Sequence, residues 1–200
     1  MIMDYPIIAI YSLAPQSGKT ALAIRIARQC HFLRIAFADP IKRMALEAIS
    51  SFGVRYTQAI RYVYDNKEAV IPNLGVTARY LLQTLGTEWG RNLIHEDVWV
   101  RAMEERFREI RSTTGQSIVI DDMRFRNEAE WVVRMGGLTV RIDRDSAMQS
   151  YRGAHASEGA LAEFKPHLIL ANNSTLDDLW EGFIHGVQKL HGTGFYTGDY

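Results

Sequence analysis

One stretch near the start of the chain constrains the fold more than any other. Residues 7–11, Ile-Ile-Ala-Ile-Tyr, form an apolar run typical of a short buried strand. The sequence Ser17-Gly-Lys-Thr20 follows, and residues 21–30 then show helical periodicity. A strand, a loop ending in Gly-Lys-Thr and a helix are together typical of a phosphate-binding loop. The stretch therefore predicts nucleotide binding.

The chemistry of such a loop assigns roles to its residues. The loop's backbone N–H groups and the N-terminus of the following helix face a polyphosphate, because partial positive charge collects there. Lys19 is expected to reach the β- and γ-phosphates, and the Thr20 hydroxyl to hold Mg²⁺. We therefore predict that ATP contacts Pro15, Gln16, Ser17, Gly18, Lys19 and Thr20.

One position departs from the usual pattern G-x-x-x-x-G-K-[ST]. Leu13 stands where the first glycine is expected, and that glycine allows backbone angles that are costly for leucine. The alternative interpretation is an ordinary strand-to-helix turn with a surface lysine. We expect that, if Leu13 is harmless, the backbone amides from Pro15 onward surround the phosphates.

Composition narrows the class of protein. Its 200 residues suffice for one well-cored domain, and the hydrophobic fraction of 47% is typical of a soluble globular protein. Lys+Arg and Asp+Glu both number 23, so no overall positive charge favours nucleic acid. The single cysteine, Cys30, excludes an internal disulfide and suits a reducing compartment. No signal-peptide pattern or membrane-length apolar run is seen, so a cytoplasmic location without membrane association is expected.

The middle of the chain is predicted to be helical. A second strand, residues 32–38, ends at Asp39-Pro40, where Asp39 is expected to cap a helix, to contact a ligand, or both. Helical patterns then fill residues 41–112, interrupted by a loop at 67–75. A block of this size between two strands predicts a substrate-binding arm.

The last part of the chain returns to strands, expected at 116–121, 138–142 and 168–171, with helices at 127–135 and 176–190. The first of these strands ends at Asp121 and Asp122, where a second Mg²⁺-organising carboxylate would lie beside a phosphate loop. Residues 144–157 lack a clear period, which predicts either a lid or a solvated surface loop. The lid would carry Arg144, Arg152 and His155.

Two blocks are more distinctive than the phosphate loop. One runs from Arg79 to Arg91 (RYLLQTLGTEWGR) and continues to Trp99, and the other is the sequence DMRFRNE of residues 122–128. They resemble, in the same order, motifs of the bacteriophage-type deoxynucleoside monophosphate kinases, a branch of the P-loop kinases. The resemblance covers about residues 7–180 and includes further segments at 38–42, 67–68, 71–72, 136–137, 155–158 and 172–173.

The resemblance implies an α/β fold of the three-layer P-loop NTPase type. Its sheet would have five parallel strands in the order 2-3-1-4-5 with helices on both faces. The core would comprise residues 1–40 and 113–190, with a helical arm at 41–112, a lid at 144–157 and a tail at 191–200. The implied reaction transfers the γ-phosphoryl group of ATP to the 5′-phosphate of a deoxynucleotide, with Mg²⁺, in phage nucleotide metabolism.

The resemblance also assigns site residues. Lys19, Asp122 and Arg124 are expected to be catalytic, with Arg124 contacting the acceptor phosphate. Thr20 and Asp121 are expected to hold the metal, with Asp122 as the alternative to Asp121. Many relatives read Gly-Lys-Asp-Thr in the loop, whereas here Thr20 follows Lys19 directly, so the exact magnesium ligand stays open. Arg144 and Arg152 are expected on the ATP side. Predicted substrate contacts are Asp39, Lys42, Arg79, Gln83, Trp89, Arg91, Arg124 and Glu128.

Several alternatives stay open at this stage. Arg79 and Arg91 are also compatible with exposed helix positions in weak ion pairs, and Trp99 is at least equally compatible with core packing. A related P-loop kinase would instead phosphorylate hydroxymethyl-pyrimidines within DNA, which requires a pocket for an extruded base. A third possibility is a nucleotide-binding protein without catalysis. A homodimer is possible.

Overall fold

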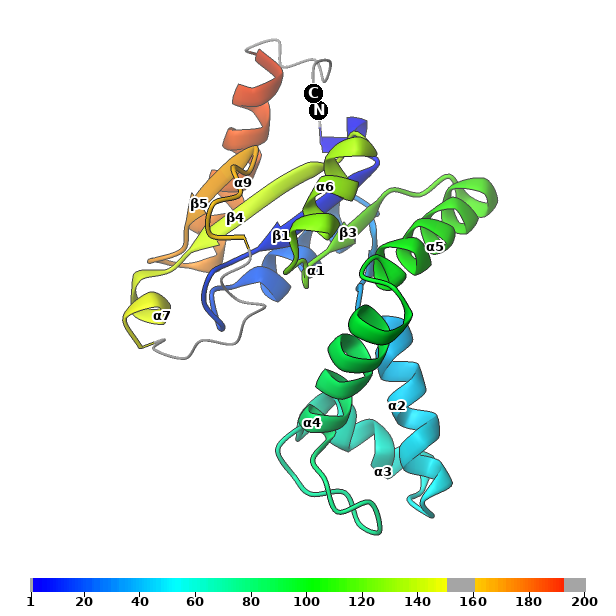
Figure 1. The fold of residues 1–200 in the computed structure, drawn as a ribbon. Coiled ribbons are helices and arrows are strands. Elements are labelled where there is room, and N and C mark those ends of the chain that lie inside the picture. Colours follow the sequence, from blue (N-terminus) through cyan, green and yellow to red (C-terminus); the bar gives the residue numbers. More distant parts are fainter. Residues whose placement is uncertain (1, 151–160, 193–200) are drawn as a thin grey trace. The chain divides into compact units, whose positions relative to one another are not determined.

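The computed structural model describes residues 2–150 and 161–192 (Figure 1), without the side chains of residues 148–150. Within this range the chain forms two compact units, Met1–Ala36 with Arg106–Tyr200, and Phe37–Glu105, which are described here one at a time. None of the described helices combines the length and apolarity needed to cross a membrane.

The first unit is built on one parallel sheet. Its strands are β1 (Ile7–Tyr11), β2 (Leu33–Ile35), β3 (Ile118–Ile120), β4 (Leu138–Asp143) and β5 (Leu168–Ala171). They follow the order β2-β3-β1-β4-β5, and every neighbouring pair is parallel. The predicted fold class and strand order are therefore confirmed. The carboxyl ends of β1 and β3 bring the phosphate loop and Asp121 to the same edge of the sheet.

Helices cover both faces of this sheet (Figure 1). On one face α1 (Lys19–Gln29) and α9 (Leu176–Gly192) bury Ile8 and Ile10 of β1 among their apolar residues. On the other face α6 (Arg126–Arg134) buries Trp131, which meets Phe107 of α5 (Val98–Thr114) edge to face. β1 is buried along its whole length because it is covered on both sides.

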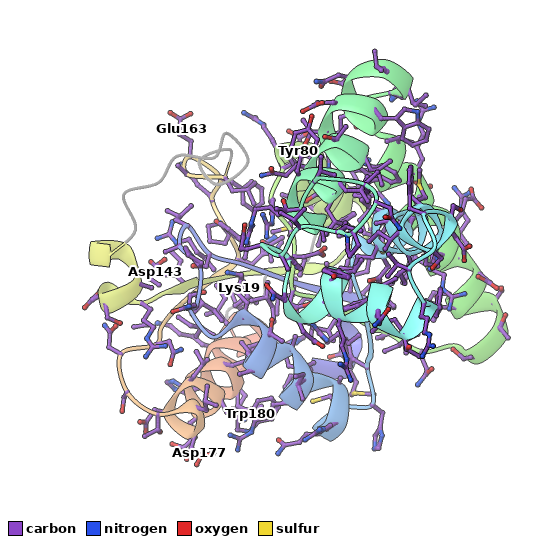
Figure 2. All side chains as sticks on the ribbon, turned by 90° about the horizontal axis from the view of Figure 1, so that it is seen from below. Lys19, Tyr80, Asp143, Glu163, Asp177 and Trp180 are labelled. Atoms are coloured by element: carbon purple, nitrogen blue, oxygen red, sulfur yellow. The ribbon has the colours of Figure 1, made fainter. Side chains whose placement is uncertain are left out.

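The two helices on the first face are also joined at their edges. Arg25 of α1 lies 5.0 Å from the centre of the Trp180 ring and 2.5 Å from Oδ1 of Asp177, both in α9 (Figure 2). Stacking on an aromatic face and pairing with a carboxylate are both favourable for a guanidinium. These contacts keep the helix that begins at the phosphate loop in place.

The second unit is helical. It contains α2 (Asp39–Ser51), α3 (Tyr56–Ile60) continued by a π-helical turn η2 (Arg61–Asp65), and α4 (Ala78–Gln83) continued by a longer π-helix η3 (Thr84–Ile94). The Thr77 side chain caps α4 by accepting from the Tyr80 N–H, as its position before the helix predicts. The core of this unit contains Ala45, Ile49, Val63, Ile71 and Ala78.

Close packing in the second unit depends on two glycines of η3. A Cβ atom added at Gly90 would lie 2.4 Å from the ring of Trp99, and the indole N–H of Trp99 donates to the Gly86 carbonyl at 2.7 Å. Trp99 is 4% exposed, so the core interpretation of this residue is correct.

Several predicted boundaries were wrong. β2 ends at Ile35 rather than residue 38, and α2 begins at Asp39 itself, with Ala38 at the N-cap, so Asp39 is not the cap. The helix expected from Ala78 to Gly86 or beyond does continue, through η3 to Ile94, with its second part π-helical. In addition, a 3-10 turn η1 (Ile2–Asp4) precedes β1.

The predicted lid is partly helical. Its first residues form the short helix α7 (Asp145–Ser150), where no regular structure was expected. The structure shows Asn173 accepting from the Asp145 N–H at 2.9 Å and donating to Asp145 Oδ2 at 2.8 Å, which anchors the start of α7. Arg152 and His155 lie outside the described residues.

A histidine between two strands makes stability depend on pH. The Thr139 N–H donates to Nδ1 of His167 at 3.1 Å, so this nitrogen must be unprotonated, and burial lowers the pKa of the imidazole below its ordinary value. The folded state therefore binds fewer protons than the unfolded state below about pH 6.5, and stability falls as the pH drops through that range. We expect melting temperature to fall more between about pH 7.5 and 5.5 in the wild type than in His167→Asn. Equal falls would contradict this role.

Candidate active site

The phosphate loop takes an unexpected path. Among the described non-glycine residues, positive φ angles occur at Gln16 (56°), His31 (57°) and Asn73 (63°), so Leu13 keeps ordinary backbone angles. The left-handed positions of the loop are Gln16 and Gly18 (φ 99°). Leu13 therefore causes no left-handed backbone strain, because the loop makes its left-handed turns later in the sequence.

Gly18 is required for a second reason. A Cβ atom at this position would lie 2.4 Å from Nδ2 of Asn172, so the Asn172 side chain would have to move away from the loop. That amide donates to the Ser17 carbonyl at 2.8 Å in a buried hydrogen bond. Nearby, the Arg144 guanidinium donates to the Gln16 carbonyl at 3.1 Å. Arg144, which follows β4, and Asn172, which follows β5, therefore fix the backbone of the phosphate loop by hydrogen bonds to its carbonyl groups.

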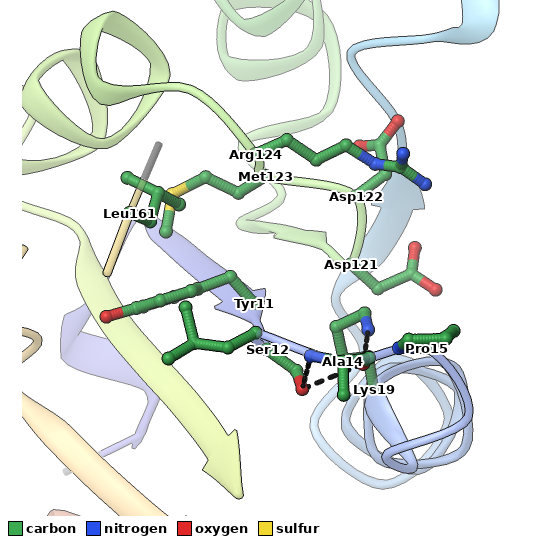
Figure 3. A pocket seen from close by; sticks show the side chains of 11 residues that line it. Tyr11, Ser12, Ala14, Pro15, Lys19, Asp121, Asp122, Met123, Arg124 and Leu161 are labelled. Atoms are coloured by element: carbon green, nitrogen blue, oxygen red, sulfur yellow. Dashed lines mark hydrogen bonds between the residues drawn. The ribbon is translucent and has the colours of Figure 1, made fainter. Parts of the chain in front are cut away.

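Lys19 lies over its own loop. Its Nζ donates to the Ala14 carbonyl at 3.3 Å (Figure 3). It also donates to the Ser17 hydroxyl at 3.3 Å. The Ser12 side chain stabilises the loop's first turn, since its Oγ accepts from the Ala14 N–H at 3.2 Å and donates to the Ala14 carbonyl at 2.9 Å. The ammonium group therefore lies over the loop, and Lys19 lines the cavities next to it.

Thr20 and Asp121 meet across the sheet edge. The Thr20 hydroxyl donates to Oδ2 of Asp121 at 2.6 Å, and the Asp121 residue is 6% exposed. The neighbouring Asp122 is less buried and lines a cavity beside Lys19. Both acids line the cavity with Arg124 (Figure 3), and Asp121 in addition accepts a hydrogen bond from the loop threonine.

Two cavities share Lys19. The larger, of about 410 Å³, is lined by residues 16–21 together with Arg144, Asn172, Ser174 and Leu176. The smaller, of about 70 Å³, is lined by Tyr11, Pro15 and Lys19 together with Asp121, Asp122 and Arg124, among others (Figure 3). Because Lys19 borders both, a group bound in either cavity would meet its positive charge.

The Tyr11 side chain forms one wall of the smaller cavity. Its hydroxyl donates to the Phe164 carbonyl at 3.2 Å. Burial raises the pKa of this phenol, and the nearby Arg141 opposes the shift. The neutral hydroxyl is a structural hydrogen-bond donor near neutral pH.

Glu128, predicted to contact substrate, has structural contacts instead. Its Oε2 accepts from the N–H groups of Arg124 at 2.7 Å and Phe125 at 3.1 Å, at the start of α6, and the residue is 2% exposed. Such a carboxylate satisfies backbone donors at a helix N-terminus. Glu128 therefore shapes the turn that carries Arg124, and we do not include it among the proposed substrate contacts.

The other predicted substrate residues belong to the second unit. Lys42 lies 3.4 Å from Oδ1 of Asp39 and 5.4 Å from the centre of the Tyr64 ring. Arg79 pairs with exposed Glu68. Arg91 donates to the Glu96 carbonyl at 3.0 Å, Trp89 is 39% exposed and lies 6.3 Å from Trp99, and Gln83 is half-buried.

Two residues of the site were not predicted as site residues from the sequence. Asn172 was noted only as part of a motif, although its position just after a strand at the carboxyl edge of the sheet was an available signal. Arg34 donates from Nε and Nη2 to both oxygens of Asp121, at 3.1 and 2.8 Å. No motif marked Arg34, which lies inside a short strand.

Known proteins similar in sequence to this chain are deoxynucleotide monophosphate kinases by name. A family described as deoxynucleotide monophosphate kinase matches residues 55–182. A putative deoxynucleotide monophosphate kinase of Acanthamoeba polyphaga mimivirus is 27% identical over 184 residues, covering 86% of this chain and 92% of the viral protein. The deoxynucleoside-5′-monophosphate kinase of Escherichia phage T5 is 28% identical over 134 residues, covering 64% of this chain and 52% of the phage protein.

A solved structure was also found, that of a gluconokinase from Sinorhizobium meliloti 1021. It is 13% identical, covers 96% of this chain and 97% of its own, and has a TM-score of 0.48, which is too low to add to the assignment. The family match spans more than half of the chain and includes both distinctive sequence blocks. The chain belongs to the deoxynucleotide monophosphate kinase family.

Proposed function

We propose that the protein transfers the γ-phosphoryl group of ATP to the 5′-phosphate of a deoxynucleoside monophosphate, giving a deoxynucleoside diphosphate and ADP. The observation that carries this proposal is that Lys19 lines both cavities. A lysine that borders both the larger and the smaller cavity is suited to phosphoryl transfer between groups bound in them. Such a transfer depends on positioning and charge neutralisation rather than on a strong base.

The larger cavity is proposed as the site of the phosphate donor. Its floor is the phosphate loop and the N-terminus of α1, which supply backbone N–H groups to a triphosphate. Its volume of about 410 Å³ falls within the usual range for small-molecule sites. Arg144 at its rim adds a second positive charge. ATP would therefore lie along residues 15–20.

The smaller cavity is proposed as the site where the two phosphates meet. Arg124 and Lys19 bring positive charge to its walls, and Asp122 also lines it. Arg124 would hold the acceptor phosphate, since a guanidinium can donate two hydrogen bonds to a phosphate. Asp122 would position the acceptor or a metal-bound water rather than act as a base, because a nucleotide phosphate is already ionised.

The chemistry of the Thr20 and Asp121 oxygens fits Mg²⁺. Magnesium prefers oxygen ligands, usually keeps several waters and takes few ligands from the protein in kinases. The described residues contain no group of three or more His, Cys, Asp or Glu side chains that could hold a metal alone, which suits a cation that arrives with the nucleotide. When bound, Mg²⁺ would neutralise charge on the β- and γ-phosphates. Thr20 and Asp121 would orient it.

Recognition of the deoxynucleotide is proposed for residues of the second unit. Trp89 and Tyr80 are large side chains with exposed fractions of 39% and 55%, which leaves ring surface available to a base. Gln83, one turn after Tyr80, can hydrogen-bond a base edge, and Asp39, Lys42, Arg79 and Arg91 can contact sugar and phosphate groups. A large side chain of this unit would also exclude a 2′-hydroxyl, and equal turnover of ribo- and deoxynucleotides would contradict this part of the proposal.

One assay tests the proposed reaction. Purified protein with ATP and Mg²⁺ would be offered dAMP, dGMP, dCMP, dTMP, their 5-substituted forms and hydroxymethylated DNA, and ADP release would be followed. We expect rapid turnover with at least one free deoxynucleotide. Phosphate incorporated only into DNA would show a DNA kinase instead. Tight ATP binding without turnover of any acceptor would show a nucleotide-binding protein without kinase activity.

A further inference from the structure

The carboxylate of Asp121 is held by an arginine of the neighbouring strand. Arg34 belongs to the edge strand β2 and lies opposite Val119 of β3 in the sheet. Its Nε donates to Oδ1 of Asp121 at 3.1 Å and its Nη2 to Oδ2 at 2.8 Å. Two parallel hydrogen bonds from one planar guanidinium fix both the position and the rotation of a carboxylate.

The orientation of Asp121 in turn determines that of Thr20. Oδ2, which accepts from Arg34, also accepts from the Thr20 hydroxyl at 2.6 Å. A hydroxyl has one proton and two lone pairs, so a proton directed at Asp121 leaves the lone pairs directed away from it. A threonine oriented in this way can give a lone pair to a cation. Arg34 therefore acts on Thr20 through Asp121.

Arg34 also changes the charge of this corner of the site. The side chain of Asp121 is 5% exposed, so water screens its charge weakly, whereas the side chain of Arg34 is 41% exposed and reaches toward solvent. A carboxylate paired with a guanidinium attracts a divalent cation less than an unpaired one. In the protein without nucleotide, this ion pair opposes metal binding.

We propose that Arg34 is a positioning residue that couples metal binding to nucleotide binding. It fixes Asp121 so that the Thr20 hydroxyl is correctly turned, and it keeps the affinity of the nucleotide-free protein for divalent cations low. The metal then enters together with the triphosphate, whose own negative charge attracts it. This inference rests on the metal site proposed above.

Two substitutions separate orientation from charge. Arg34→Gln removes the charge, and Arg34→Lys keeps it but replaces the planar fork by a single ammonium group. Arg106→Gln is the matched control, because Arg106 pairs with Glu109 at 2.5 Å on exposed side chains of α5. Mn²⁺ binding without nucleotide is measured by electron paramagnetic resonance, and kcat is measured with ATP and the best deoxynucleotide.

We expect Arg34→Gln to bind Mn²⁺ without nucleotide about tenfold more tightly than the wild type. The added affinity should disappear in the double variant Arg34→Gln, Asp121→Asn. Arg34→Lys should keep the wild-type Mn²⁺ affinity but lose about tenfold or more in kcat, because the carboxylate is no longer held at both oxygens. Arg106→Gln should match the wild type in both measurements.

Two results would overturn the proposal: wild-type Mn²⁺ affinity in a folded Arg34→Gln protein, or wild-type kcat in Arg34→Lys. The second result is informative even if Arg34→Gln does not fold. Failure of the metal site itself would look different. In that case the ATP complex of Thr20→Ala would bind Mn²⁺ as tightly as the ATP complex of the wild type, whatever the Arg34 variants do.

Discussion

Replacing Lys19 by methionine is expected to lower kcat by about a thousandfold, because a charged donor to the transferring phosphoryl group is removed. Methionine keeps most of the length and apolar stem of lysine. The lysine ammonium contacts the Ala14 carbonyl and the Ser17 hydroxyl, which are neutral acceptors of its own loop, and we expect the fold to survive the change. Steady-state kinetics and the melting temperature measure the two effects separately.

Lys165→Met is the matched control for this experiment. Lys165 is an exposed residue of the same unit and does not line either cavity. Its loss should leave kcat within about twofold of the wild type, since surface substitutions of this kind change little. A Lys19→Met protein that keeps its fold and more than about a tenth of the wild-type kcat would exclude Lys19 as the charge shared by the two cavities.

Replacing Arg124 by methionine is expected to reduce kcat/KM for the deoxynucleotide by about a hundredfold or more, while the affinity for ATP stays close to that of the wild type. Arg124 lines the smaller cavity but not the larger one, so its loss should affect the acceptor. The turn that carries it is held through its backbone N–H by Glu128, and this bond remains in the variant.

The chain offers a close control for Arg124. Arg126, two residues later, has a side chain that is 77% exposed and pairs with Glu130 on the surface of α6 at 2.8 Å. Arg126→Met should therefore change neither constant appreciably, since exposed pairs of this type contribute little. If Arg124→Met weakened ATP binding as much as it weakened use of the deoxynucleotide, Arg124 would belong to the donor side instead.

The sheet could be predicted from the sequence because its signals are local. β1 and β5 have the expected bounds, since each is a short apolar run next to turn residues. β2 was predicted too long, because the apolar residues after Ile35 belong to the turn that precedes α2. The strand order came from the family resemblance rather than from the strands themselves.

The parts of the site that could not be predicted depend on contacts between distant residues. Arg34 and Asp121 are 87 residues apart, and Asn172 and Ser17 are 155 apart. Nothing in the local pattern around Arg34 distinguishes it from an exposed strand residue. The local pattern around Leu13 also left its effect open, because the pattern does not show that the loop turns at Gln16 and Gly18.

The buried tryptophans provide a spectroscopic marker for each unit. Trp131 lies in the core of the first unit at 0% exposure, and Trp99 lies against Gly86 and Gly90 of the second at 4%. Each unit also has one further indole, Trp180 in the first and Trp89 in the second. Phenylalanine substitutions of the two tryptophans in one unit would confine indole fluorescence to the other. The order in which the two units melt, and the response of each to either nucleotide, then becomes measurable in an otherwise intact chain.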